Sequence, residues 1–154
     1  MTDKEIRQAQ LKLMAEAEIC YLTTLSRDGY PYTRAVFNLR NKQEFPALVK
    51  IFAKHDNDFL TYFGTNTSSE KISQLKANPA VSVYCCQPKE FHGLMLSGDI
   101  EIVTDPEIKK QLWQDGWERY YPTGPTDPDY TVLRLKPRLA RGWYKSGKFE
   151  FRLG

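Results

Sequence analysis

Apolar and polar positions repeat with two different periods along this chain, and the change of period separates helices from strands. Apolar residues recur at helical spacing over residues 3–17, where Thr2 and Glu5 form a capping box at the start. β-forming residues then fill 19–25 and 32–39, with an Asp-Gly turn signal between them. The N-terminal quarter is therefore predicted to be a helix followed by an antiparallel hairpin.

The rest of the chain is dominated by runs with strand character. These runs cover residues 59–64, 80–86, 94–103, 130–135, 139–144 and 148–152. The run 94–103 contains Ser97-Gly98, a pair typical of a bulge where a barrel bends. Residues 40–57 mix polar and apolar positions around Phe45-Pro46, so we expect a short helix or an irregular crossover there.

Two further capping boxes predict helices between these strands. Thr67 with Glu70 predicts a helix that begins at Ser68 and stops at Asn78-Pro79, and Thr104 with Glu107 predicts another. Six or seven mostly antiparallel strands, about three flanking helices and no regular βαβ alternation indicate a mainly β (α+β) fold, a small barrel. The length of 154 residues fits a single domain over 1–154.

Composition narrows the possible partners. No segment approaches the roughly 18 apolar residues that span a bilayer, and the charged N-terminus opens no apolar signal region, so no membrane association and a cytoplasmic location are expected. A net charge of +3 is too small for a nucleic-acid footprint. Small phosphorylated molecules remain compatible partners.

Cysteine and histidine usage argues against several kinds of site. Cys20 and the adjacent Cys85-Cys86 lack the spacing of a disulfide framework or a zinc site, and we expect them to be reduced, half-buried strand residues. His55 and His92 lie near no second ligand and no nucleophile motif, so neither a metal site nor a catalytic triad is predicted. The phosphate loop and the dinucleotide fingerprint are both absent.

The turn from the strand 59–64 into the next helix carries the features of an anion site. The first N–H groups of a helix have no intrahelical partner, and the peptide dipoles place partial positive charge there. Thr65, Ser69 and Lys71 gather hydroxyls and one cation at this point. The same residues would also serve as a plain helix cap, and the pattern alone leaves both interpretations open.

Two other groups of residues have two interpretations each. Arg34 shares one face of its strand with apolar neighbours, so its guanidinium is either a solvated rim residue or a fork for a phosphate or carbonyl. The aromatic cluster of Trp113, Trp117, Tyr120 and Tyr121 is either core or dimer interface, or a platform on which a ring stacks.

Taken in order, four segments resemble the pyridoxamine 5′-phosphate oxidase-like family of flavin-binding split barrels. The segments are Asp28–Val36, Phe63–Ile72, Leu75–Val83 and Leu94–Glu101. The stretch Leu112–Gly124 is similar to the general-stress-protein branch of that family. The resemblance spans about residues 15–145 and implies a split β-barrel.

The resemblance also implies a homodimer with FMN bound at the subunit interface. In that arrangement Arg34, Ala35, Val36 and Phe37 line the flavin, Gly64 and Thr65 meet the ring or ribityl chain, and Ser69 and Lys71 approach the phosphate. Trp113, Trp117 and Trp143 are the candidates for the aromatic groups that the second subunit contributes. No catalytic residue is implied.

The implied function is that of an FMN-dependent oxidoreductase acting on a small substrate, in which the flavin supplies the redox chemistry. A non-catalytic flavin-binding stress protein that stores or senses the cofactor is the alternative, and haem or a deazaflavin could replace FMN. The Arg-x-His segment of the vitamin B6 oxidase has no counterpart in Lys145–Arg152, Leu39 stands where that enzyme has a lysine, and Glu70 where it has a basic residue. Oxidation of pyridoxamine phosphate itself is therefore not expected.

Overall fold

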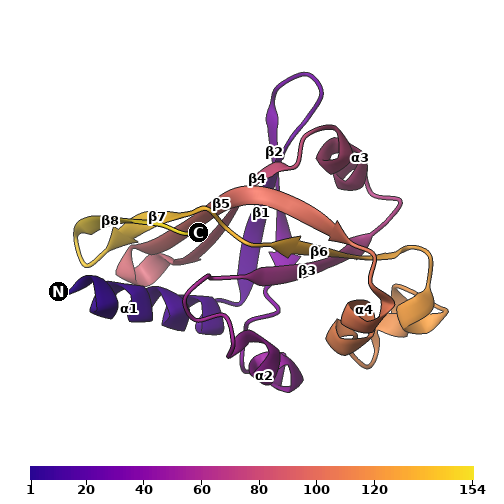
Figure 1. Cartoon of the computed structure of the whole chain (residues 1–154), viewed down its shortest axis with the longest axis horizontal. Coiled ribbons are helices and arrows are strands. Elements are labelled where there is room, and N and C mark those ends of the chain that lie inside the picture. Colours follow the sequence, from indigo (N-terminus) through magenta and orange to yellow (C-terminus); the bar gives the residue numbers. More distant parts are fainter.

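The computed structural model describes residues 1–154 as one curled antiparallel sheet with helices around it (Figure 1). The helices are α1 (Asp3–Glu16), α2 (Val49–Phe52), α3 (Glu70–Ala77) and α4 (Pro106–Leu112). The strands are β1 (Ile19–Leu25), β2 (Pro31–Phe37), β3 (Thr61–Asn66), β4 (Ala80–Gln87), β5 (His92–Val103), β6 (Tyr130–Leu135), β7 (Leu139–Tyr144) and β8 (Gly147–Arg152). The mainly β split-barrel class is confirmed, with eight strands and four helices instead of six or seven and about three.

Strand β5 joins the two halves of the sheet. The strand order is β2-β1-β4-β5-β6-β3, and β7 pairs with both β5 and β8. Along one edge of β5, Ser97 pairs with Leu139 of β7 and Ile100 pairs with Leu135 of β6. Gly98 lies at this change of partner, where an added Cβ would be 3.3 Å from backbone atoms of the β6–β7 connection. Ser97-Gly98, the pair expected to form a bulge, is thus the point where β5 stops pairing with β7 and begins to pair with β6.

Helix starts were predicted with mixed success. The Thr2–Glu5 capping box of α1 is present. The prediction of a capping box at Thr67 and Glu70 is wrong. Helix α3 begins at Glu70, and its N-cap residue Ser69 makes no side-chain hydrogen bond to the helix. The hydroxyl of Thr67 bonds elsewhere, as described below. Helix α4 is capped by Asp105, whose side chain accepts from Glu107 N, and not by Thr104.

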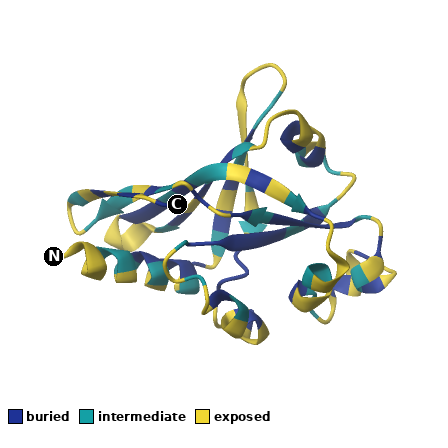
Figure 2. Cartoon of the chain, viewed as in Figure 1, coloured by how far each residue is buried: buried dark blue, intermediate teal, exposed yellow.

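The core has two parts, one on each side of β3 and β6. The larger cluster joins α1 and α3 to the sheet strands, and α1 packs against β4 while α3 packs against β1. The smaller cluster is rich in aromatic rings and lies among residues 39–62 and 103–132. Figure 2 shows β3 buried along most of its length, whereas β2 is largely exposed. Strand β3 is covered on both faces, so its side chains do not alternate between buried and exposed.

Two further expectations concern the cysteines and the crossover over residues 40–57. Cys20 of β1 and Cys85 of β4 are fully buried and not half-buried, with their sulfur atoms 2.7 Å apart across the sheet, and only Cys86 is half-buried. The crossover over residues 40–57 contains a 3-10 turn and the short α2, as predicted. None of the helices combines the length and the apolar character needed to cross a bilayer.

Candidate functional site

A cavity of about 380 Å³ opens between β2, β3 and the segment that follows α4, and we name it the β2–β3 cavity. Its lining is Ile19, Ala35, Val36, Phe37, Leu39, Gly64, Thr65, Asn66, Lys71, Trp117, Tyr120 and Tyr121. Strand β2 is an edge strand of the sheet, so alternate N–H and C=O groups of its backbone have no strand partner. The cavity therefore offers apolar side chains along most of its wall and unpaired backbone groups along one edge.

Lys71 provides the positive charge of this cavity. Its Nζ donates to Thr65 Oγ1 at 2.6 Å and to Ser69 Oγ at 3.3 Å, and it forms no ion pair. An ammonium has three donors, so the two hydroxyls leave capacity for another acceptor. Burial, and secondly the charge of Arg34, lowers the pKa of Lys71. A half-buried cation among hydroxyls with no carboxylate partner is an arrangement suited to an anion.

The loop between β3 and α3 is held by a residue that the sequence did not identify, Asp129. Its carboxylate accepts from Asn66 Nδ2 at 2.6 Å and from Ser68 N at 2.8 Å, and its carbonyl accepts from Thr67 N at 2.7 Å. The Thr67 hydroxyl donates to the Pro128 carbonyl. The hydrogen bonds from Asn66 and Ser68 lower the pKa of Asp129. The signal that could have indicated this role is the Asp-Pro-Asp turn directly before β6.

Arg34 lies beside the cavity and does not line it. Its Nη1 donates to Thr24 Oγ1 at 2.7 Å and to the Tyr32 carbonyl at 3.0 Å, and Thr24 in turn donates to Gln74 Oε1 at 2.6 Å. Burial lowers the pKa of Arg34, and the nearby Glu70 opposes that shift. Arg34 thus adds positive potential near Lys71 while it ties β2 to β1 and α3.

Aromatic rings close the far side of the cavity. Trp117 and Tyr121 are nearly buried, at 8% and 6% exposure, whereas Tyr120 is half-exposed. Trp113 stands behind them, in an edge contact with Trp117 at 5.9 Å between ring centroids. Burial raises the pKa of Tyr121 to about 12, so its hydroxyl stays protonated at neutral pH.

The structure therefore brings most of the expected site residues together. Ala35, Val36, Phe37, Gly64, Thr65, Lys71 and Trp117 line the β2–β3 cavity, while Arg34, Ser69 and Trp113 lie next to it. Trp143 is on β7, where it contacts Phe91. Three lining residues were not among the expected ones, namely Ile19, Leu39 and Asn66. Tyr120 and Tyr121 belong to the aromatic cluster that could form a stacking platform. Trp117, expected as a candidate from the second subunit, lines the cavity of its own chain.

The lining also limits the chemistry available to the side chains. It contains no histidine, cysteine, aspartate or glutamate. The side chains of the lining with acid–base capacity are therefore those of Lys71, Tyr120 and Tyr121. The arrangement can bind an anionic ligand with an apolar, planar body and position it.

Comparison with known proteins identifies the family of this chain. The model of the family described as pyridoxamine 5′-phosphate oxidase matches residues 6–144. The chain belongs to the pyridoxamine 5′-phosphate oxidase family. Membership confirms the resemblance drawn from the four segments. A search of curated proteins gave no match.

Solved structures of this family share the fold over almost the whole chain. A protein related to general stress protein 26 from Clostridium acetobutylicum is 31% identical, with a TM-score of 0.79 over 98% of this chain and 96% of its own. General stress protein 26 from Bacillus anthracis is 20% identical, with a TM-score of 0.71 over 97% and 99%. A family-related FMN binding protein from Nostoc punctiforme is 14% identical, with a TM-score of 0.67 over 97% and 87%. The general-stress-protein branch is thus the part of the family to which this chain is similar.

Proposed function

We propose that the β2–β3 cavity binds FMN and that the protein is an FMN-dependent oxidoreductase acting on a small substrate. The observation that carries this proposal is the position of Lys71, a half-buried cation that contacts two hydroxyls, has no counter-ion and lies at one end of an apolar cavity. The related structure from Nostoc punctiforme, described as an FMN binding protein, supports the same interpretation.

The residues present fit a flavin mononucleotide. Lys71 with Thr65 and Ser69 would hold the phosphate, because an ammonium and hydroxyl donors match its oxygens. The apolar side chains of β2 and the ring of Trp117 would flank the flavin ring system. Bound FMN supplies hydride or electron transfer. The chain itself contributes binding, orientation and the exclusion of water.

Alternatives to FMN have less support from the lining. Haem would require an axial ligand, yet His55 pairs with Asp58 and His92 with Gln10, and neither histidine lines this cavity. A non-catalytic protein that stores or senses flavin is the competing function, because the lining contains no histidine or carboxylate. Reduction of the bound flavin by a physiological donor separates these two functions.

We further propose that the protein forms a homodimer that covers the flavin. The strands β1, β2 and β4 expose three aromatic side chains, Tyr21, Phe37 and Tyr84, at 41%, 48% and 44%. Tyr21 and Tyr84 are direct neighbours across β1 and β4, and Phe37 also lines the cavity. Exposed aromatic side chains on neighbouring strands favour an interface with a second copy.

The first experiment is a titration of the purified protein with FMN, followed by flavin fluorescence, together with light scattering for the mass. We expect saturable binding and twice the chain mass of 17.9 kDa. A colourless protein without FMN binding contradicts the cofactor assignment, and a monomer with full affinity contradicts the interfacial site. Stopped-flow reduction by NADH or NADPH then tests turnover. A flavin that no donor reduces at a useful rate would favour the storage or sensing function.

A further inference from the structure

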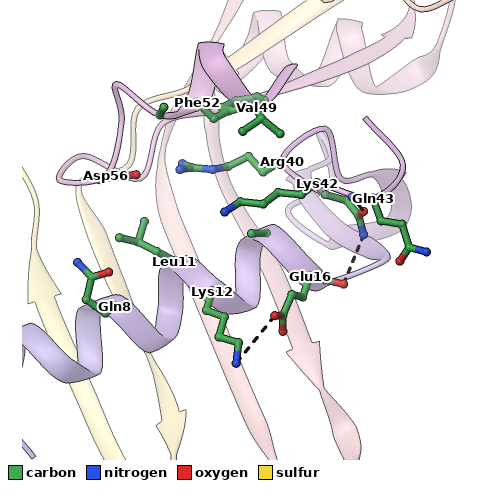
Figure 3. Close-up of a pocket in the computed structure, with 13 residues that line it drawn as sticks. Gln8, Leu11, Lys12, Glu16, Arg40, Lys42, Gln43, Val49, Phe52 and Asp56 are labelled. Carbon is green, nitrogen blue, oxygen red and sulfur yellow. Dashed lines mark hydrogen bonds and ion pairs between the residues drawn. The ribbon is translucent and has the colours of Figure 1, made fainter. Parts of the chain in front are cut away.

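A second, larger cavity of about 560 Å³ lies between α1 and the crossover that leads into α2, and we name it the α1 cavity (Figure 3). It is separate from the β2–β3 cavity, and the two share no lining residue. Cavities of this size are typical of small-molecule sites. Consecutive residues serve the two cavities, since Leu39 lines the first and Arg40 the second.

Arg40 is the central residue of the α1 cavity. Only 8% of the residue is exposed, and its guanidinium forms no ion pair. Nη1 donates to the Leu60 carbonyl at 2.8 Å, and the group lies over the Phe52 ring at 5.2 Å from the centroid. A guanidinium has five N–H donors, so one carbonyl leaves most of them without a protein acceptor. A buried cation with spare donors that borders a cavity is a binding group for an anion.

The walls around Arg40 are fixed by buried amide side chains. Asn38 Nδ2 donates to the carbonyls of Met14 and Ala17, both at 2.7 Å, and Asn41 Nδ2 donates to the same Ala17 carbonyl at 3.1 Å. These bonds attach the crossover to the C-terminal end of α1. The cavity is therefore formed by two segments that are tied together on both sides of Arg40.

Charge and polarity limit the kind of ligand. Figure 3 shows Arg40 and Lys42 extending in the same direction between α1 and α2. Lys12 and Glu16 also border the cavity but pair with each other at 4.0 Å, which leaves Asp56 as the remaining carboxylate. Asp58 also acts on the charge of Arg40, but it lies outside the lining and accepts a hydrogen bond from Leu60 N. The lining therefore offers two cations, Arg40 and Lys42, against one carboxylate, which favours a monoanion. The apolar part of the wall, with Leu11, Val49 and Phe52, suits an apolar body.

We propose that the α1 cavity is a second ligand site, which binds a small carboxylic acid with an apolar body. The carboxylate faces Arg40 and Lys42, and the body packs against the side of α1 and α2. The proposal does not depend on flavin binding, because no residue of the β2–β3 cavity takes part in it.

The test uses benzoate as the acid and benzamide as its neutral analogue, titrated into the full-length ¹⁵N-labelled protein and followed by amide chemical shifts. We expect saturable shifts within residues 8–16 and 40–56, and binding of benzamide at least about tenfold weaker, since it lacks the charge. Equal binding of benzoate and benzamide overturns the proposal. Shifts confined to Ala35–Phe37, Gly64 and Thr65 also overturn it, because the acid would then occupy the other cavity.

Variants separate a binding role of Arg40 from a purely structural one. Lys42→Gln changes an exposed side chain and should weaken benzoate about threefold, while Lys50→Gln, on α2 but outside the cavity, is the matched control. Arg40→Lys keeps the charge but loses the planar fork and should weaken benzoate about tenfold. If Arg40→Lys fails to fold, Lys42→Gln decides. Unchanged benzoate affinity in Lys42→Gln contradicts the site.

Discussion

The two cavities of this protein each contain a cation that forms no ion pair, yet they are assembled in different ways. Around Lys71 the polar partners come from within six residues, Thr65 and Ser69. Around Arg40 the wall comes from α1 and from the crossover, and its carbonyl partner is Leu60. A site made by neighbours in sequence is visible as a motif, whereas a site made by packing becomes visible only in the structure.

The largest effect is expected for Lys71→Ala in the β2–β3 cavity. Loss of a charge-assisted hydrogen bond to phosphate should weaken FMN binding by roughly 1–3 kcal/mol, or about 5- to 150-fold. Lys76→Ala, which changes an exposed lysine of the same helix, is the matched control. The measurement is an FMN titration by fluorescence. Benzoate binding should stay unchanged in Lys71→Ala, and a parallel loss there would show that the two cavities are not independent.

A smaller effect is expected for Arg34→Ala. Because its guanidinium already donates to Thr24 and lies outside the cavity lining, its removal should weaken FMN binding by about 1 kcal/mol. The thermal midpoint should also fall, since Thr24 and Gln74 lose a donor. Arg34→Lys should recover most of the affinity if charge is what matters. FMN affinity that is as low in Arg34→Lys as in Arg34→Ala would instead indicate a need for the planar fork.

Asp129→Ala tests whether Lys71 needs the hydrogen bonds between Asp129 and the β3–α3 loop in order to bind the FMN phosphate. The change removes the acceptors of Asn66 Nδ2 and Ser68 N, while Asp129 itself does not line the cavity and Lys71 is kept, so FMN affinity should fall less than in Lys71→Ala. Asp129→Asn keeps one carbonyl acceptor and should lie between the native protein and Asp129→Ala. Fluorescence titration and thermal melts follow both variants. Native affinity in Asp129→Ala would show that the loop keeps its shape without the carboxylate.

The smallest effect is expected from pH. The pKa of Lys71 is lowered from 10.5 by burial and by Arg34, and the charged form is the one that binds phosphate. The contribution of Lys71 is complete below its lowered pKa and is lost as pH rises through it, so FMN affinity should begin to fall before pH 10.5. The measured quantity is the difference in affinity between the native protein and Lys71→Ala. A difference that stays constant up to pH 10.5 would contradict the lowered pKa.

The local patterns of the sequence predicted most of the strands but not the contacts between distant segments. The hairpin β1–β2 and the strands β6 to β8 agree with the expected boundaries to within two residues, because alternation and turn residues define them locally. The capping box at Thr67 failed because Asp129, 61 residues away, supplies the acceptor for the Ser68 N–H. The burial of Arg40 was invisible for the same reason. Its environment is made by α1, by Phe52 and by Leu60, which no periodicity connects.

The contact between Asp129 and the β3–α3 loop has a consequence for the order of events during synthesis. The loop with Thr65 and Lys71 leaves the ribosome long before Asp129 and β6 do, and closing a segment of that length is slow compared with forming α3 itself. A nascent chain that ends before Asp129 contains Lys71 but lacks the residue that holds the β3–α3 loop. The β3–α3 loop therefore reaches its held form only after the chain has been made as far as Asp129.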